Sequence, residues 1–558
     1  ATSQVLEHVS TTEHGISFSG VVPVMLNSVK FAVASGEDGA AVMAFDLLCT
    51  LADADGLLLL NPYIKPIMQL ILETLSQADC ATETRNSALM VFAALVKSKP
   101  RAMGKYPHIQ QAVQLLVKLV CMGEEEEASD RAARTAAAVA AGVQVSGSPA
   151  SGTAQYCLDQ LALHLPNNIV FPPTVSAVMQ CVKSSNCHVR AGGLIALSTI
   201  AEGTIRCTRE HLHKLMPVVL ASAKDGVSSV RRSACVVLGQ WIEHIGVGMV
   251  EHHTSVLPPV LNLIGDSDAS VQEAALYCWE NYADNMDPEE VRPYFKPLMN
   301  QMSLMLRSGQ LQHQVMAFSA IGACAAASKN EFRPYFAQTI SVVKQAMSSV
   351  EEKSKTLLAA RSLECCGQIA VAVGPELFRP HLQDCIRFAQ LATKQDETIL
   401  HDHAISFFSN LCVCFGKEFA PFATQLLPYL FQTVAAMDIL QGVQGQDTEL
   451  GAGFAGFDDD EEEENDETNL KLSVSTANAD KKVSAIRCLG AIADYAPAVF
   501  ATNSSVANEA VKQLHDVRKM SDREFRETIA KKKKNERHSH TKKTGIGLLA
   551  CRDSMFSD

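Results

Sequence analysis

A repeat of 41 residues is the sequence feature that most constrains the fold. Val189, Val230 and Val271 lie 41 residues apart at each step, and each lies near the start of a stretch with apolar residues at helical spacing. Other helical segments alternate with these stretches, at 209–225, 250–266 and 291–306. We call these segments the first helices of each pair and the valine-containing stretches the second helices. The repeating unit is therefore predicted to be a pair of helices joined by short turns.

Prolines recur inside the first helix of each pair, at Pro217, Pro258, Pro259 and Pro297. A proline inside a helix bends it at a cost of about 3 kcal/mol, so its recurrence predicts a bend built into the unit. A period near 41 is typical of HEAT or armadillo repeats, and two helices per period with a bent first helix favour HEAT. Looser copies of the pair flank the strict repeats on both sides. We expect an all-α HEAT-repeat solenoid, whose helix pairs bury their apolar faces by stacking on neighbours.

Four segments are expected along the chain. Residues 1–440 form the HEAT-repeat array, and residues 480–516 complete its last repeat. Between them, residues 441–479 form an acidic disordered loop inserted between the two helices of that repeat. Residues 517–558 form a basic tail with no helix-pair pattern, and Lys531–Lys534 in it has the composition of a nuclear localisation signal, although a flexible tail is the preferred interpretation.

The acidic loop carries seven consecutive acids, which repel one another and resist burial. Its simplest interpretation is a tolerated insertion, and the functional alternative is an acidic arm that contacts basic partners or competes with them. The acids are Asp458, Asp459, Asp460, Glu461, Glu462, Glu463 and Glu464.

Charge and motifs exclude several classes of function. The net charge of −13 disfavours direct nucleic-acid binding, because phosphates need basic compensation, and suits basic protein partners instead. We see no apolar run long enough for membrane insertion. No phosphate-binding loop, nucleophile elbow or zinc-protease helix is present, so we expect no enzymatic activity and no cofactor.

Cysteine and histidine patterns do not indicate a disulfide framework or a metal site. The 17 cysteines are scattered, mostly in apolar helical runs, and we interpret them as reduced, buried thiols. His252–His253 and the pair His401 and His403 lack a cluster of further ligands at metal-binding spacing.

Acids recur at one position of three consecutive second helices: Glu202, Glu243 and Asp284, again 41 residues apart. Equivalent positions of a solenoid stack about 10 Å apart, so these acids would form a ladder able to bind spaced Lys or Arg side chains. Asp494 is an outlying counterpart. The alternative is a solvated helix end with local basic partners.

Two further groups share this region of the repeat. Arg190 and Arg231, with Asp225 and Asp266 in the turns, resemble the Asp–Arg ladder that joins neighbouring HEAT repeats, and we favour that structural role. Trp241 and Trp279 on adjacent second helices are candidates for partner binding, although such residues more often fill a core.

The segment from Ser228 to Leu306 resembles the importin-β (karyopherin-β) family of nuclear transport receptors, most closely its importin-4-like branch. The stretches 257–286 and 332–347, and the acidic run before a second helix, occur in the same order in that branch. The resemblance covers roughly residues 1–500. It implies a receptor that binds basic cargo such as histones or ribosomal proteins on the second helices and FG-repeat nucleoporins on the first helices. It also implies release by Ran–GTP and shuttling between cytoplasm and nucleus.

The same resemblance predicts that the chain is a fragment, because family members are about twice as long. It would lack the N-terminal repeats, which hold the main Ran-binding surface, and the C-terminal half. The alternative hypothesis is a static HEAT-repeat scaffold subunit of a larger assembly, which would need neither FG-binding sites nor an acidic arm.

Overall fold

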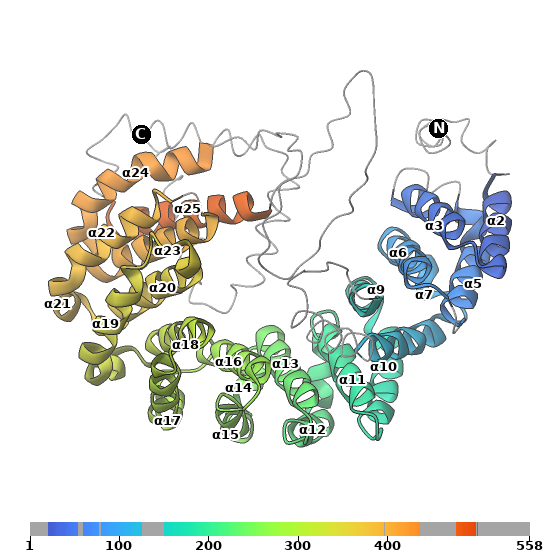
Figure 1. Cartoon of the computed structure of the whole chain (residues 1–558), viewed down its shortest axis with the longest axis horizontal. Helices are drawn as coiled ribbons and strands as arrows, with labels where there is room; N and C mark the ends of the chain where they lie inside the picture. Colours follow the sequence, from blue (N-terminus) through green and yellow to red (C-terminus); the bar gives the residue numbers. More distant parts are fainter. Residues whose placement is uncertain are drawn as a thin grey trace, which may run out of the picture. The chain divides into compact units, whose positions relative to one another are not determined.

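The computed structural model describes residues 21–53, 60–77, 80–124, 150–395, 397–435 and 476–497, together with residue 499. Within these residues every regular element is a helix and no strand occurs, as expected for an all-α chain. The chain divides into two compact units, Ala1–Cys278 and Trp279–Asp558, and the boundary falls inside helix α16 (Ala269–Ala283). Figure 1 shows the helices in sequence colours.

Unit 1 consists of alternating first and second helices, as the repeat predicts. The first helices are α2 (Val21–Ser35), α5 (Ile64–Leu75), residues 109–124, α10 (Asn167–Cys181), α12 (Ile205–Ser222) and α15 (His253–Leu263). The second helices are α3 (Asp38–Asp53), α6 (Thr82–Ser98), α9 (Ala150–His164), α11 (Cys187–Thr199) and α13 (Ser228–Ile245). The short helices α7 (Pro100–Gly104), α14 (Val247–Val250) and η2 (Asn61–Tyr63) lie in connections.

Unit 2 continues the alternation. Its first helices are α17 (Pro288–Arg307), α19 (Arg333–Met347), α22 (Leu382–Ala392) and α24 (Ala420–Ala435). Its second helices are α18 (Leu311–Ser328), α20 (Thr356–Val373), α23 (Thr398–Phe415) and α25 (Thr476–Tyr495). The connections contain η3 (Lys329–Phe332), η4 (Lys353–Lys355), α21 (Pro375–Phe378), η5 (Arg379–His381) and η6 (Gly416–Phe419).

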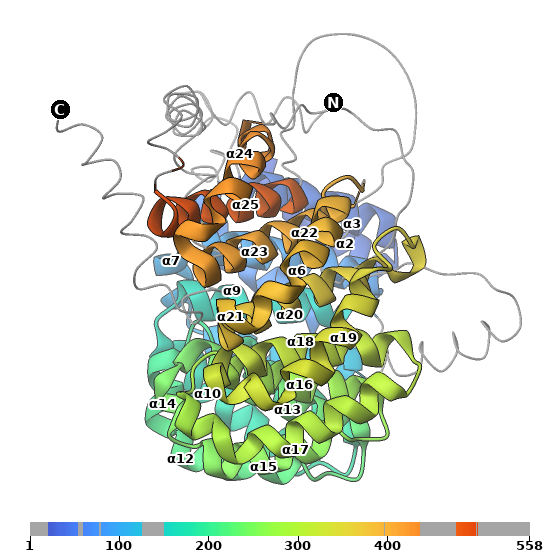
Figure 2. The same ribbon diagram turned by 90° about the vertical axis from the view of Figure 1, so that its left-hand side faces the viewer.

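Within each unit the second helices stack in a row. In unit 1, α3 packs on α6, α6 on α9, and α11 on α13; in unit 2, α18, α20, α23 and α25 pack in succession (Figure 2). Each row is built on alanine, leucine and other apolar side chains, which let the helix backbones approach closely. First helices pack against the second helices of their own pairs, for example α12 on α13 and α19 on α20. This two-row arrangement is that of a HEAT-repeat solenoid and confirms the predicted fold class.

The predicted prolines lie inside first helices. Helix α12 continues through Pro217, α15 through Pro258 and Pro259, and α17 through Pro297. The same feature extends beyond the strict repeats, since α10 contains Pro172 and Pro173. The proline is therefore a property of the helix pair, and it is tolerated because neighbouring helices hold each first helix in place.

Four second helices end at residues with a positive φ angle. Gly246, Gly374 and Gly416 follow α13, α20 and α23 with φ angles of 63°, 86° and 54°. Glycine tolerates this region because it has no Cβ. Lys329 takes the same place after α18 with φ 50°, at a cost of about 1 kcal/mol or more. These residues reverse the chain into the next first helix.

The last helix pair is interrupted in sequence but joined in space. Helix α24 packs on α25 although residues 436–475 separate them in the chain. Helix α25 begins at Thr476, slightly before residue 480, where the sequence pattern placed the return to the repeat. Most of the segment 441–479 and all of the tail 517–558 lie outside the described residues.

One helical stretch in the described part of the chain has the length and apolar content of a membrane span. It covers Lys353–Val373, and 67% of its most apolar 18-residue window is buried inside the protein. Helix α20 within it packs against second helices on both sides, α18 and α23, so its apolar residues are accounted for by the core of unit 2.

Candidate functional site

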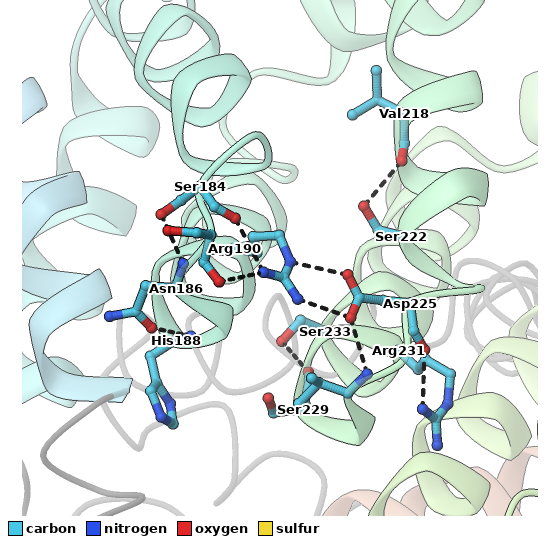
Figure 3. Close-up of polar contacts among 12 residues, drawn as sticks. Ser184, Asn186, His188, Arg190, Val218, Ser222, Asp225, Ser229, Arg231 and Ser233 are labelled. Atoms are coloured by element: carbon cyan, nitrogen blue, oxygen red, sulfur yellow. Dashed lines mark hydrogen bonds and ion pairs between the residues drawn. The ribbon is translucent and has the colours of Figure 1, made fainter.

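Two arginine–aspartate pairs join successive helix pairs of unit 1, and Figure 3 shows the first of them, Arg190 with Asp225. Nε and Nη2 of Arg190 donate to the two carboxylate oxygens of Asp225 at 2.9 and 3.0 Å, and Nη1 donates to the carbonyl of Ser184 at 3.0 Å. Arg231 binds both oxygens of Asp266 at 2.8 Å, and its Nη1 donates to the carbonyl of Asp225 at 3.0 Å. Each arginine, in the first turn of a second helix, thus holds the turn that follows the next first helix.

Charge pairing shifts the titration of both carboxyls. Burial opposes ionisation of Asp225, but hydrogen bonds from Arg190 and from the backbone N–H of Val227, together with the nearby arginine charges, hold the pKa of Asp225 below its usual value. Hydrogen bonds from Arg231 likewise lower the pKa of Asp266. Bidentate, charge-assisted bonds of this kind fix geometry as well as adding stability, so the pairs act as a structural ladder.

Replacing Arg231 with alanine should destabilise unit 1 by about 2–4 kcal/mol, because Asp266 would be left largely buried without its partner. Urea unfolding followed by circular dichroism measures the effect. Arg206→Ala is the matched control, since Arg206 pairs with Glu210 on one exposed helix face and should cost less than about 0.5 kcal/mol. Equal losses in the two variants would contradict the structural role of Arg231.

The acids predicted to form a ladder in unit 1 occupy different surroundings. Glu202 lies half-buried in the turn after α11. Glu243, half-buried in α13, accepts hydrogen bonds from the Tyr277 hydroxyl and from Nε2 of Gln240, the latter at 3.2 Å. Burial and the neighbouring Glu243 carboxylate raise the pKa of Tyr277, so its hydroxyl stays protonated and donates. One carboxylate oxygen of Glu243 therefore already accepts hydrogen bonds from within the protein.

Trp241 and Trp279 do not serve as surface anchors. Both side chains are 0% exposed and are among the largest fully buried side chains of the described chain. The prediction that they contact a partner is wrong, because the core between helices takes up both indole rings. Their sequence positions on second helices did not distinguish the buried face from the accessible one.

A cluster of charged residues gathers on the second helices α20 and α23 and at the C-terminal end of α16, all in unit 2. Nη1 of Arg361 donates to Oε2 of Glu364 at 2.8 Å, and Nε2 of His403 lies 3.3 Å from the same oxygen. Glu280 of α16 is hydrogen-bonded to Ser319 of α18 and lies within electrostatic range of Arg361 and Asp284. We call Glu280, Asp284, Arg361, Glu364 and His403 the unit 2 charge cluster.

Three carboxyls of the unit 2 charge cluster differ in protonation. Burial would raise the pKa of Glu364, but bonds from His403 and Arg361 bring it to about 2. Burial raises the pKa of Glu280 to about 7, and burial with repulsion from Glu364 does the same for Asp284. Asp284 is nevertheless exposed at the surface. The surrounding protein removes part of the water around its carboxyl group without covering the side chain. A cation that reached Asp284 would therefore find a carboxyl whose charge is only partly balanced.

Four members of the unit 2 charge cluster were missed by sequence analysis. Asp284 was predicted because it follows the 41-residue period. That period loosens downstream, so Glu364 does not lie a whole number of 41-residue steps from Asp284 and was not recognised. The pair Arg361 and Glu364, three residues apart on one helix face, was a usable signal. His403 was noted only as a possible metal ligand. Glu280 sits inside an apolar-looking helix and carried no signal.

The remaining candidates add little to a site. Asp494 is exposed in α25, and partial loss of water around its carboxyl group raises its pKa. The acids at 458–464 lie outside the described residues. Among the residues that the structure describes, no group of three or more histidine, cysteine or acidic side chains could hold a metal ion.

Comparison with known proteins is consistent with a HEAT-repeat solenoid. A family model for the EF3 N-terminal HEAT repeat matches residues 243–356, and one for the Vacuolar 14 Fab1-binding region matches residues 188–278. The crystal structure of Kap121p bound to Pho4p superposes with a TM-score of 0.71 at 21% identity, over 88% of this chain and 47% of that one. The structure of Kap121p bound to Nup53p gives a TM-score of 0.70 at the same identity, over 88% of this chain and 47% of that one.

Curated relatives narrow the class. The probable importin subunit beta-4 of Schizosaccharomyces pombe is 24% identical over 87% of this chain and 44% of its own length. Importin subunit beta-3 of Saccharomyces cerevisiae is 24% identical over 75% of this chain and 38% of its own length. Human importin-4 is 24% identical over 66% of this chain and 34% of its own length. The chain is similar to members of the importin-β family over most of its length. It spans less than half the length of the curated relatives it matches.

Proposed function

We propose that the chain is part of a nuclear import receptor and binds basic protein segments through acids of its second helices. The observation that carries the proposal is the pair Glu280 and Asp284, where carboxyls with raised pKa values stand beside an accessible surface of unit 2. A lysine or arginine placed there would favour their ionised forms. The net charge of −13 adds long-range attraction for a basic partner.

Similarity to importins supports the wider proposal. Cargo would include basic proteins such as histones or ribosomal proteins, and the acids Glu202 and Glu243 would offer a separate acidic surface on unit 1. FG-repeat nucleoporins would bind the first helices, Ran–GTP would control release, and the protein would shuttle between cytoplasm and nucleus. The similarity to Kap121p, solved with Pho4p and with Nup53p, supports protein partners of both kinds.

A labelled peptide rich in Lys and Arg tests the proposal by fluorescence anisotropy. The double variant Glu280→Gln with Asp284→Asn should bind at least about tenfold more weakly than the native chain, because two carboxylates that pair with cations are removed. Binding by the native chain should tighten from pH 6 to pH 8 as both carboxyls ionise, and should weaken with salt.

The matched control removes two acids from first helices and their connections. Glu331 pairs with Arg292 and Asp384 with Lys344, so Glu331→Gln with Asp384→Asn leaves the unit 2 charge cluster intact. At pH 8, where Glu280 and Asp284 are mostly ionised, the two double variants change the net charge by nearly the same amount. This control should bind the peptide nearly as well as the native chain. An equal loss of peptide binding in both double variants would show that net charge alone attracts the peptide, and it would contradict a specific site at Glu280 and Asp284. Salt-resistant binding that is insensitive to pH and to all four substitutions would favour a static HEAT scaffold.

A further inference from the structure

Two pairs of cysteines lie with their sulfur atoms close together. In the part of the chain that the structure describes, Sγ of Cys121 is 3.8 Å from Sγ of Cys181, and Sγ of Cys366 is 3.6 Å from Sγ of Cys385. A disulfide has a sulfur–sulfur bond of about 2.05 Å, so either pair would need a movement of less than about 2 Å to close. The two pairs differ in access and in protonation.

Two glycines bring Cys121 and Cys181 together. Cys121 lies in the first helix formed by residues 109–124, and Cys181 ends the next first helix, α10. Both pack on α11. A Cβ on Gly192 would lie 2.5 Å from Cα of Cys121, and a Cβ on Gly193 would lie 2.5 Å from Cβ of Cys181. The absence of side chains at these glycines thus allows two successive first helices to place their thiols side by side.

Hydrogen bonding divides the roles of the two thiols. Cys121 is buried, and its single thiol hydrogen can be donated to Sγ of Cys181 or, at 3.6 Å, to the carbonyl of Val189. Donation to Cys181 stabilises the Cys181 thiolate. That hydrogen bond lowers the pKa of Cys181 to about 7 and raises the pKa of Cys121. Cys181 is only half-buried. A half-ionised, accessible thiolate next to a protonated thiol is the arrangement of an oxidation-sensitive cysteine beside its resolving partner.

We propose that Cys121 and Cys181 form a peroxide-sensitive dithiol site that closes to a disulfide. The Cys181 thiolate attacks one oxygen of hydrogen peroxide, the O–O bond breaks, and hydroxide leaves and takes a proton to become water. Cys181 then carries a sulfenic acid. The Cys121 sulfur attacks the Cys181 sulfur, the S–O bond breaks, and the hydroxyl leaves as a second water with the Cys121 proton. The two thiols lose two electrons and the peroxide gains them.

The disulfide would fix one joint between helix pairs of unit 1. It would link the first helix at 109–124 directly to the next first helix, α10, across 60 residues of sequence. Small rotations between neighbouring helix pairs set the curvature of a solenoid, so a covalent link at this joint would restrict them. A cellular thiol would reverse the link, as expected for a disulfide in a reducing compartment.

Cys366 and Cys385 supply a control within the same chain. Both thiols are 0% exposed, and burial followed by the hydrogen bond that Cys366 donates to Cys385 raises the pKa of Cys366. Their sulfur atoms are slightly closer than those of Cys121 and Cys181. Proximity alone would therefore predict that both pairs oxidise, whereas access and ionisation predict oxidation of Cys121 and Cys181 only.

The experiment treats the native full chain with hydrogen peroxide at neutral pH and maps disulfides by non-reducing peptide mass spectrometry. The expected product is a Cys121–Cys181 link that dithiothreitol reverses, with Cys366 and Cys385 still reduced. Before oxidation, iodoacetamide should alkylate Cys181 about fivefold faster than a thiol of ordinary pKa and equal exposure, because a larger thiolate fraction outweighs its lower nucleophilicity. Cys121→Ser should trap Cys181 as a sulfenic acid, detectable with a dimedone probe.

Two results would overturn the site. One is a native, folded chain in which Cys121 and Cys181 stay reduced while peroxide oxidises other cysteines. The other is equal linkage of both cysteine pairs, which would show that proximity and general unfolding govern the reaction. Because the first result needs no substitution, the test does not depend on whether Cys121→Ser folds.

Discussion

Replacing Trp241 with alanine should destabilise unit 1 by about 3–5 kcal/mol. The indole of Trp241 is 0% exposed in α13, and its removal leaves a cavity where the surrounding helices can relax only in part. Helix pairs of a solenoid contact only their neighbours, so the loss should be largest at the joint around α13. Urea unfolding and amide hydrogen exchange of the native and variant chains measure the size and place of the effect.

Val247→Ala is the control for this substitution. Val247 begins α14, a few residues from Trp241 in sequence, and is 72% exposed, so its truncation should change stability by less than about 0.5 kcal/mol. A Trp241→Ala chain that keeps native stability but no longer binds a basic peptide would contradict the structure, and it would restore the surface role that the sequence suggested.

Removing the carboxylate of Glu364 should destabilise unit 2 by about 3 kcal/mol at neutral pH. Glu364→Gln would deprive Arg361 and His403 of their shared acceptor. The pKa of Glu364 falls from 4.5 to about 2 in the folded chain, and one pKa unit corresponds to 1.36 kcal/mol, which gives the same order of magnitude. Stability against urea at several pH values measures this contribution.

The sign of the pH effect follows from the lowered pKa. The stabilisation by Glu364 is fully present above pH 4.5 and is lost as the pH falls toward about 2, so the native chain and Glu364→Gln should converge there. Glu352→Gln is the control, because Glu352 pairs with Lys355 on an exposed surface and should cost little. Parallel stability curves for native chain and Glu364→Gln from pH 5 to pH 2 would show that the charge cluster does not stabilise the fold.

The helix pairs were predictable because their signals are local and repeated. Apolar spacing, internal prolines such as Pro217 and the 41-residue step between valines define a unit that can bury its faces only by stacking. The same strict step brought Arg231 and Asp266 into a fixed relation, since both positions recur where one helix pair meets the next.

The candidate site was less predictable because it depends on side-chain direction. Periodicity placed Glu243 and Trp241 on the same helix. It did not show that Tyr277 donates a hydrogen bond to Glu243 or that the core encloses Trp241. In unit 2 the repeat length drifts, so Glu364 could not be aligned with Asp284 by spacing alone. Contacts across helices, which sequence spacing does not record, decide which acids remain available to a partner.

Zero-length cross-linking tests the proposed binding surface most directly. A water-soluble carbodiimide joins a lysine of the bound basic peptide to a carboxyl in direct contact, and mass spectrometry identifies that carboxyl. The structure predicts cross-links to Asp284 and Glu280, and few to Glu331 or Asp384, which are paired with basic side chains. Cross-links confined to Glu331, Asp384 and other acids of the first-helix side, with none at Asp284 or Glu280, would contradict the proposal that second-helix acids bind basic cargo.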